Sequence, residues 1–594
     1  MRRTLLLRSA LGFAAMGLSA YPAQAALTLS SDASADLEVK VLANGLSQPT
    51  DMAELPDGRV VITQRLGDVV VVDKNGDQTE SGTIMVYPEF GEQGLLGVVA
   101  DPDFATNHYL YFYASAGTNS DDPKNKHKVF RIVLGDDGML GERTTIIDKG
   151  LRASRSSVDG GASNHNGGGL QIYKGKLYLS VGDTGHNKTP PTNELGTCLN
   201  ATNGKILRVN LDGSTPDDNP LSGETMVTGC DDWNTALKDV APEKKIFSWG
   251  YRNPYRFWID PMTSRMWIGD VGETTREEIS VGSPIDDAGP GSKGEHFGWP
   301  FAEGTTKYTT SQQSFQPANS CMGIKPARDC IPPVYDYGHS MNNNCVIGGL
   351  IPDGCGWKAP WTARYLFGDN GSGRIWYLDV NADRSGVMST TTKDFASSQG
   401  VGSFRMGANG VLYIAEVSGG VVDKVTPKGL DPAMCGGSTG GTGGMGAGGA
   451  AAGSTSTGGV SGSAPQGGNT NGGSSGTGPS GGRMGNAGSG ATTSNGGSGT
   501  GGATSGGTSS TMGGSSTTMG GTSTTAGTNS SGGNTSTAGS GATSAAGTGG
   551  SGGDDKGGCG CRVGGDAPSS TSLMALSGLL GLMVFGRRRS RRAR

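Results

Sequence analysis

The feature that most constrains the fold is a strand phrase that recurs throughout the first 432 residues. Each pass holds an apolar stretch, an Asp-Gly or Asn-Gly type of turn, a strand ending in Tyr or Trp with aliphatic residues, and another strand after a loop. The alternation has a period of two, which is typical of half-buried antiparallel strands, and no segment keeps a helical period. The six passes are Met52–Asp73, Gly97–Val133, Gly168–Leu211, Phe257–Val281, Gly349–Asp379 and Ser403–Val425.

Six similar sheet units in one stretch predict an all-β fold, a six-bladed β-propeller over residues 37–432. A β-sandwich is the alternative, but it does not account for strand phrases that repeat with long, variable loops between them. In a propeller the loops at one end of the channel converge. Residues that are far apart in the sequence can therefore build one site.

The composition changes sharply near Gly436. The chain has 594 residues and 107 glycines, and residues 436–556 are nearly all Gly, Ser, Thr, Ala and Asn. Such a segment buries too little apolar surface to offset the entropy of ordering it. We expect a disordered linker there.

Both ends of the chain carry export signals. Residues 1–25 have the charge, apolar core and small-residue order of a signal peptide. Residues 557–594 contain Cys559 and Cys561, then the apolar run Leu573–Phe585, then an arginine cluster, which predicts a short C-terminal transmembrane segment. This order resembles the MYXO-CTERM sorting tails of exported bacterial proteins. The resemblance implies a protein attached to the cell surface or outer membrane, or released when the tail is processed, with the membrane as a partner of the tail.

Charge and cysteine content narrow the class further. The formal net charge is −5, and much of the arginine excess lies in the tail, so we do not expect a nucleic-acid partner. Nine cysteines in an exported chain favour disulfides. The nearest-neighbour pairing is Cys198 with Cys230, Cys321 with Cys330, and Cys345 with Cys355, although six cysteines allow 15 connectivities. The body has an odd number, so one cysteine is unpaired or joins the tail.

One histidine stands among glycines just ahead of an apolar strand, in the segment Ser163–Leu170. Glycines allow positive φ and a close approach of a ligand, and imidazole suits proton transfer near neutral pH. His165 is therefore a candidate general base, with a simple polar turn as the alternative. Asp183, Arg252 and Asp270 lie near strand-to-loop junctions of the same and the next unit, where a propeller would bring them together.

Six short pieces, HNGGGL, LYLSVGD, GKILRVNLDG, GYRNP, GDVGE with EEI, and FGWP, occur in one order. In that order they resemble the soluble PQQ-dependent sugar dehydrogenases, also called glucose/sorbosone dehydrogenases, over roughly residues 40 to 426. The resemblance implies a six-bladed propeller that binds pyrroloquinoline quinone (PQQ) and Ca²⁺ and oxidises the C1 hydroxyl of an aldose or related sugar. An electron acceptor, not identified by the sequence, would complete the cycle.

The resemblance also implies roles for single residues. His165 matches the general base, Asp183 the carboxylate that orients it, and Arg252 the cation that stabilises charge on the reduced quinone. Asn253, Gln93 and Arg405 are the implied cofactor contacts. Gly272 and Glu273 occupy the calcium loop, with Asp270 as a neighbour, and a solvated acidic turn is the alternative there.

The chain departs from the glucose dehydrogenases in three places. The stretch Phe367–Arg374 contains no lysine to anchor the quinone, Arg405 alone stands near the second anchor, and the glutamine before Gly94-Leu95-Leu96-Gly97 is displaced. These details look closer to the branch of the hedgehog-interacting proteins, which is associated with binding. The alternative function is therefore a non-catalytic cell-surface propeller that binds a glycan or a protein, with a calcium-dependent lactonase as a weaker third hypothesis.

Overall fold

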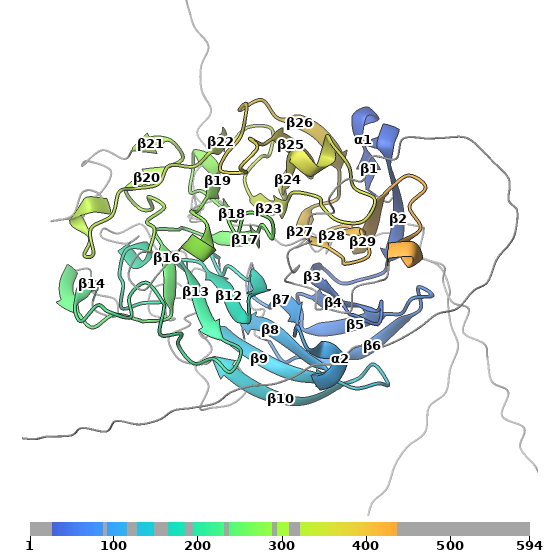
Figure 1. Cartoon of the computed structure of the whole chain (residues 1–594), viewed down its shortest axis with the longest axis horizontal. Helices are drawn as coiled ribbons and strands as arrows, with labels where there is room; N and C mark the ends of the chain where they lie inside the picture. The colour runs from blue at the N-terminus through green and yellow to red at the C-terminus, as the bar shows by residue number, and fades with distance from the viewer. Residues whose placement is uncertain are drawn as a thin grey trace, which may run out of the picture. The chain divides into compact units, whose positions relative to one another are not determined.

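The structure is a computed structural model that describes residues 27–86, 92–115, 127–147, 164–184, 194–230, 237–287, 294–307 and 321–435. Six four-stranded antiparallel units surround a central axis, with their first strands innermost (Figure 1). The all-β, six-bladed propeller predicted from the repeats is confirmed. The six sequence passes fall one to each blade.

Blades 1 to 3 follow the chain order. Blade 1 is β3 (Pro49–Glu54), β4 (Val60–Gln64), β5 (Asp68–Val72) and β6 (Gln78–Thr83). Blade 2 is β7 (Leu95–Ala100), β8 (Tyr109–Ser115), β9 (His127–Leu134) and β10 (Leu140–Ile147). Blade 3 is β11 (Leu170–Tyr173), β12 (Lys176–Val181), β13 (Lys205–Asn210) and β16 (Ile246–Trp249).

Blades 4 to 6 complete the ring. Blade 4 is β17 (Pro254–Ile259), β18 (Met266–Asp270), β19 (Arg276–Val281) and β22 (Tyr335–Gly338). Blade 5 is β23 (Val346–Leu350), β24 (Arg364–Asp369), β25 (Arg374–Asp379) and β26 (Lys393–Ser397), extended by β1 (Thr28–Leu29). Blade 6 is β27 (Val401–Met406), β28 (Leu412–Glu416) and β29 (Val421–Pro427), with β2 (Leu37–Ala43) as its outer strand.

The ring closes through the pairing of β2 with β29. The register runs from Leu37 opposite Pro427 to Ala43 opposite Val422. The first long strand of the body thus completes the last blade and covers the outer edge of β29. This closure ties the two ends of the propeller together.

Short elements lie outside the four-stranded sheets. In the described residues, the α-helices are α1 (Ser31–Asp36) and α2 (Phe104–Asn107). Accessory hairpins are formed by β14 (Val227–Cys230) with β15 (Leu237–Val240), and by β20 (Ala302–Glu303) with β21 (Thr306–Lys307). The 3₁₀ turns are Glu194–Gly196, Ile285–Asp287, Cys321–Gly323, Trp361–Ala363 and Pro432–Cys435. Among the described residues, no helix has the length and apolar character needed to cross a bilayer.

The hydrophobic core consists of layers between neighbouring blades. Leu95, Val98 and Phe112 of blade 2 pack with Val61 and Val69 of blade 1 in one such layer, and all five are buried. Alternating residues of each strand face one neighbouring blade and then the other, so both faces of the sheets are apolar. This explains why several inner strands read as continuous apolar runs.

The disulfides correct one expectation. Cys198–Cys230 and Cys321–Cys330 form as predicted. The predicted Cys345–Cys355 bond is wrong, because Cys355 is bonded to Cys435 at the end of the body. Nearest-neighbour reasoning failed because the fold brings residue 435 back to blade 5, which sequence distance does not reveal.

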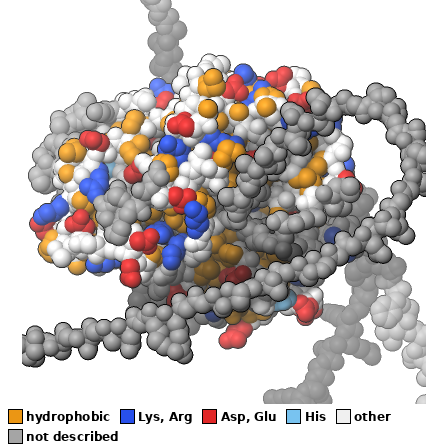
Figure 2. Space-filling model, viewed as in Figure 1, with side chains coloured by type: hydrophobic (Ala, Val, Ile, Leu, Met, Phe, Trp, Pro, Cys, Tyr) orange, Lys and Arg blue, Asp and Glu red, His pale blue; other side chains and the backbone are white. Residues whose placement is uncertain are grey.

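The expectations for residues 1–25, 436–556 and 557–594 lie outside the described residues, and so do Cys559 and Cys561. On the face shown in Figure 2, acidic and basic side chains are interspersed. The described residues that bear on function belong to the propeller.

Candidate active site

The candidate site lies at the end of the channel where the innermost strands begin. Glu92, His165 and Asn253 stand just before β7, β11 and β17, and Asp183 and Asp270 stand at or just after the ends of β12 and β18. Antiparallel pairing places the end of each second strand beside the start of its first strand. The structure thus brings together residues that the sequence separates by up to 178 positions, Glu92 to Asp270.

His165 and Asp183 form a buried pair. The imidazole Nδ1 lies 2.6 Å from Asp183 Oδ1, and the two residues are 6% and 1% exposed. A carboxylate can only accept, so Nδ1 carries the proton and Nε2 holds the free lone pair. The indole Nε1 of Trp299 donates to Asp183 Oδ2 at 3.0 Å and fixes the other oxygen. The pair is therefore held in the tautomer that a general base needs.

The backbone of His165 is bound from two neighbouring blades. Glu92 Oε2 accepts hydrogen bonds from the backbone N–H groups of His165 (3.0 Å) and Asn166 (3.2 Å). Asn253 Nδ2 donates to the same oxygen at 3.1 Å, and Asn253 Oδ1 accepts from Gly167 N at 3.0 Å. Glu92 and Asn253 are both fully buried. The histidine turn is thus joined to blades 2 and 4.

Glycine is required beside this turn. A Cβ on Gly182 would lie 2.1 Å from the carbonyl oxygen of His165 and 2.9 Å from Asn253 Oδ1. His165 itself has a φ of 62°, which is uncommon outside glycine. The close approach of the β12 end to the histidine turn therefore depends on Gly182.

Arg252 and Asn253 form a second turn, held by Asp270. The backbone N–H groups of Arg252 and Asn253 donate to Asp270 Oδ2 (3.0 Å) and Oδ1 (2.7 Å). The Arg252 guanidinium donates to Val271 O at 2.9 Å and lies 5.8 Å from the Trp299 ring centroid. Burial raises the pKa of Asp270, against the lowering effect of the two amide hydrogen bonds and of Arg252.

The residues expected to bind calcium lie close together in the sequence but make different contacts. Gly272 is buried and Glu273 is half-buried, in the turn after β18. Glu303 Oε1 accepts the N–H groups of four consecutive residues, Glu273 to Arg276, and so fixes the turn. Asp270 has both oxygens bonded to backbone amides. Among the described residues, no group of three or more His, Cys, Asp or Glu side chains could hold a metal ion, so a calcium site here would need backbone carbonyls.

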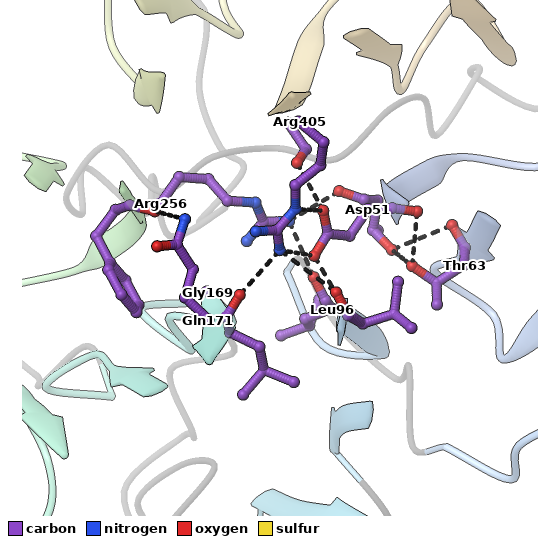
Figure 3. A network of polar contacts seen from close by, with 12 residues as sticks. Asp51, Thr63, Leu96, Gly169, Gln171, Arg256 and Arg405 are labelled. Atoms are coloured by element: carbon purple, nitrogen blue, oxygen red, sulfur yellow. Dashed lines mark hydrogen bonds and ion pairs between the residues drawn. The ribbon is translucent and has the colours of Figure 1, made fainter. Parts of the chain in front are cut away.

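Arg405 belongs to a polar network with Asp51 and Arg256 (Figure 3). Its Nε and Nη2 donate to Asp51 at 2.9 and 2.5 Å, and Nη2 also donates to Leu170 O at 3.1 Å. Arg256 enters from blade 4 and donates to Thr50 O and Leu96 O. The Arg405 and Arg256 charges lower the pKa of Asp51 against the effect of its complete burial. This network joins the inner strands of five blades, 1, 2, 3, 4 and 6.

Gln93 and Asn343 offer unused polar atoms at the mouth. In the part of the chain that the structure describes, Gln93 Oε1 and Asn343 Oδ1 are buried without a hydrogen-bond partner. The two residues precede β7 and β23, at the same end of the channel as His165. Buried orphan amides are costly unless a ligand or water satisfies them. Gln93 therefore has an acceptor without a partner, and its role as a cofactor contact stays a prediction.

Sequence reasoning missed two residues. Trp299 was noted only within FGWP, and Glu92 only as a neighbour of Gln93. Their partners lie in other blades. Trp299 belongs to one of the family-like pieces, whereas Glu92 stands beside the displaced glutamine, outside all six pieces.

A buried histidine–carboxylate pair beside a buried arginine, at the mouth of a six-bladed propeller, defines a class of proton-transfer sites. The family profile of Glucose / Sorbosone dehydrogenase matches residues 46–420. The chain therefore belongs to this family, as its sequence pieces indicated.

Relatives agree with this assignment. Aldose sugar dehydrogenase YliI of Escherichia coli is 25% identical over 67% of this chain and 94% of its own length. Quinoprotein glucose dehydrogenase B of Acinetobacter calcoaceticus is 28% identical over 46% of this chain and 54% of its own. The apo-form crystal structure of the soluble E. coli aldose sugar dehydrogenase shares the fold, with a TM-score of 0.50 and 22% identity over 66% of this chain and all of that one.

Proposed function

We propose that the propeller is a PQQ-dependent sugar dehydrogenase that oxidises the C1 hydroxyl of an aldose or related sugar. The observation that carries the proposal is the buried His165–Asp183 pair at the channel mouth, with Nδ1 engaged at 2.6 Å and Nε2 holding the lone pair. Membership of the dehydrogenase family and the names of the two curated relatives support the same activity.

In the proposed reaction His165 Nε2 takes the hydroxyl proton of the sugar. Asp183 holds the ring and stabilises the imidazolium that forms, and Trp299 keeps Asp183 in place. Arg252 supplies a buried positive charge next to the pair, suited to negative charge that develops on an acceptor. The product of oxidising a cyclic aldose at C1 is a lactone.

The cofactor site is proposed from the residues around this pair. A bound PQQ would supply a hydride acceptor, and a bound Ca²⁺ would polarise the quinone. The orphan amide oxygens of Gln93 and Asn343 would contact a polar ligand. The backbone carbonyls of Gly272 and Glu273 are the proposed calcium ligands. Asn253 is bonded to Glu92 and Gly167, so it supports the turn, and its role as a cofactor contact stays a prediction.

One observation favours the alternative of a non-catalytic propeller that binds a glycan or a protein. The Arg405 guanidinium is paired with Asp51, and the segment 367–374 has no lysine, so the cationic anchors expected for a quinone are reduced. In that case the His165 turn would serve as scaffold.

We further propose that the protein is exported and retained at the cell surface or outer membrane, or released when its tail is processed, and passes electrons to an acceptor still to be identified. The sequence of residues 1–25 and 557–594 supports this location. Fractionation of cells, with and without residues 557–594, tests it.

The activity test uses two histidines that both have a positive φ, His165 at 62° and His108 at 57°. The purified chain is titrated with Ca²⁺ and PQQ, and dye reduction is measured with several aldoses. His165→Asn keeps a side chain that tolerates a φ of 62° but removes the base, and we expect a loss of about 10²- to 10⁴-fold. His108→Asn, at a φ of 57° in a half-exposed residue of blade 2, is the control and keeps activity. Absence of a quinone spectrum and of dye reduction in the unmodified protein contradicts the proposal.

A further inference from the structure

We propose that Glu92 is a positioning residue that fixes His165 for proton transfer. Glu92 binds the backbone amides of the histidine turn, and Asp183 binds the imidazole. The inference rests on the proposed function. Its basis is a set of hydrogen bonds from the Glu92 carboxylate of blade 2 to residues of blades 3 and 4.

Blades 4, 5 and 6 show what a carboxylate at the end of the second strand does. At the end of β18, Asp270 accepts the backbone N–H groups of Arg252 and Asn253, which precede β17 of the same blade. Asp270 thus holds the turn that leads into the inner strand of its own blade.

Blades 5 and 6 repeat the arrangement. At the end of β24, Asp369 Oδ2 accepts the N–H groups of Asn344 and Cys345, each at 2.9 Å, just before β23. At the end of β28, Glu416 accepts the N–H of Gln399, shortly before β27. In three consecutive blades, therefore, the carboxylate on the second strand binds backbone amides at the entry of the first.

Blade 3 departs from this arrangement. Asp183, just after the end of β12, binds two side chains, the His165 ring at 2.6 Å and the Trp299 indole at 3.0 Å. The backbone amides of His165 and Asn166 are bound instead by Glu92, which comes from blade 2. In blade 3 the backbone amides and the imidazole thus have separate carboxylates, Glu92 and Asp183.

The division matters because the histidine turn is strained. His165 has a φ of 62°, and a non-glycine residue keeps such a conformation only when its surroundings hold it. Two amide hydrogen bonds to a buried carboxylate supply that hold, and Asn253 braces the same carboxylate from blade 4. Loss of Glu92 would release the turn and shift the ring away from Asp183.

The test combines turnover with a signal that needs neither sugar nor cofactor. The chain has six histidines, so ¹⁵N-histidine labelling gives few ring signals, and His165→Asn assigns the one at the site. In the unmodified protein we expect a strongly downfield Nδ1 proton for His165, because it is bonded to a carboxylate at 2.6 Å. In Glu92→Ala this signal is lost, and kcat falls at least tenfold with KM changed less than threefold.

A second variant guards against misfolding. Glu92→Gln keeps an oxygen for the two amides but places an NH₂ group opposite Asn253 Nδ2, so we expect a folded protein with a smaller loss of kcat, about threefold to tenfold. Glu54→Gln, a buried glutamate that binds Tyr413 and Ala408 at the other end of β3, is the matched control and leaves both readouts unchanged.

The outcomes separate the two proposals. If both Glu92 variants keep the downfield proton and kcat, the positioning role is wrong. If the proton is lost in Glu92→Ala while the unmodified protein oxidises no sugar, Glu92 positions the histidine but the proposed function fails.

Discussion

Blades 3 and 4 place a carboxylate at the same point of the repeat and use it differently. Asp270 of blade 4 binds only backbone amides in its turn, those of Arg252 and Asn253. Asp183 of blade 3 binds the His165 ring and the Trp299 indole. The scaffold position is the same, but one carboxylate stabilises a turn and the other orients an ionisable side chain.

The difference shows how a repeated fold can acquire a site. In blades 3 to 6 the repeat supplies a buried carboxylate at or just after the end of the second strand. When another residue takes over the backbone amides, the acceptor becomes available for chemistry. Blade 3 is the place where a residue from the neighbouring blade, Glu92, does so.

The largest expected effect separates the two carboxylates. Asp183→Asn turns an acceptor toward Nδ1 into an NH₂ group, which favours the wrong imidazole tautomer, and we expect kcat to fall about 100-fold or more with little change in melting temperature. Asp270→Asn leaves one backbone amide unpaired, which costs about 1–3 kcal/mol of stability, while kcat of the folded protein falls less than tenfold. Steady-state kinetics and thermal melts of both variants measure this. A larger stability loss in Asp183→Asn would reverse the assignment.

A stability effect without a catalytic one is expected in blade 5. Asp369 accepts hydrogen bonds from Asn344 N, Cys345 N, Ser372 N and the Tyr337 hydroxyl, at 2.8 to 2.9 Å. Asp369→Ala leaves these donors unpaired and should lower the free energy of unfolding by about 2–4 kcal/mol in urea denaturation. At saturating PQQ, kcat of the folded fraction stays unchanged, because Asn343 in this turn is proposed only as a binding contact. A fall in kcat would mean that the blade 5 turn also supports proton transfer.

The propeller fold could be predicted from the sequence because the patterns that indicate its strands and turns are local. Period-two alternation and glycine turns lie within each pass, and each pass became one blade. The closure by β2 and β29 was not readable, since it pairs residues 37–43 with residues 421–427. The Cys355–Cys435 bond was missed for the same reason.

The candidate site was readable only in part. The histidine loop and the Arg252 turn stand out as glycine-rich or proline-flanked pieces, and family resemblance gave them roles. The partners of Arg405 could not be read, because Asp51 is 354 positions away in the sequence. Glu92 was overlooked because its carboxylate reaches blades 3 and 4, and nothing in its own blade signals that contact.

The smallest expected effect concerns a second histidine–carboxylate pair, in blade 4. His339 Nε2 lies 2.7 Å from Glu277 Oε1, and Val346 N donates to Glu277 Oε2 at 2.9 Å. Burial raises the pKa of Glu277 to about 7, against the lowering effect of His339. This pair resembles His165–Asp183 in composition, so it tests whether such a pair is by itself sufficient for catalysis.

The pH dependence of Glu277 follows from that raised pKa. Between about pH 4.5 and 7 the folded protein keeps a proton that the unfolded chain releases, so the contribution of Glu277 to stability is greatest below pH 4.5 and is lost as the pH rises through 7. Glu277→Gln removes this dependence and can still bond to His339 and Val346. We expect its melting temperature to rise relative to the unmodified protein by a few degrees from pH 5 to pH 8, with kcat unchanged. Glu38→Gln, on the outer strand β2, is the control. If Glu277→Gln instead lowers kcat as Asp183→Asn does, the two pairs act alike and His165–Asp183 is not the only pair that supports catalysis.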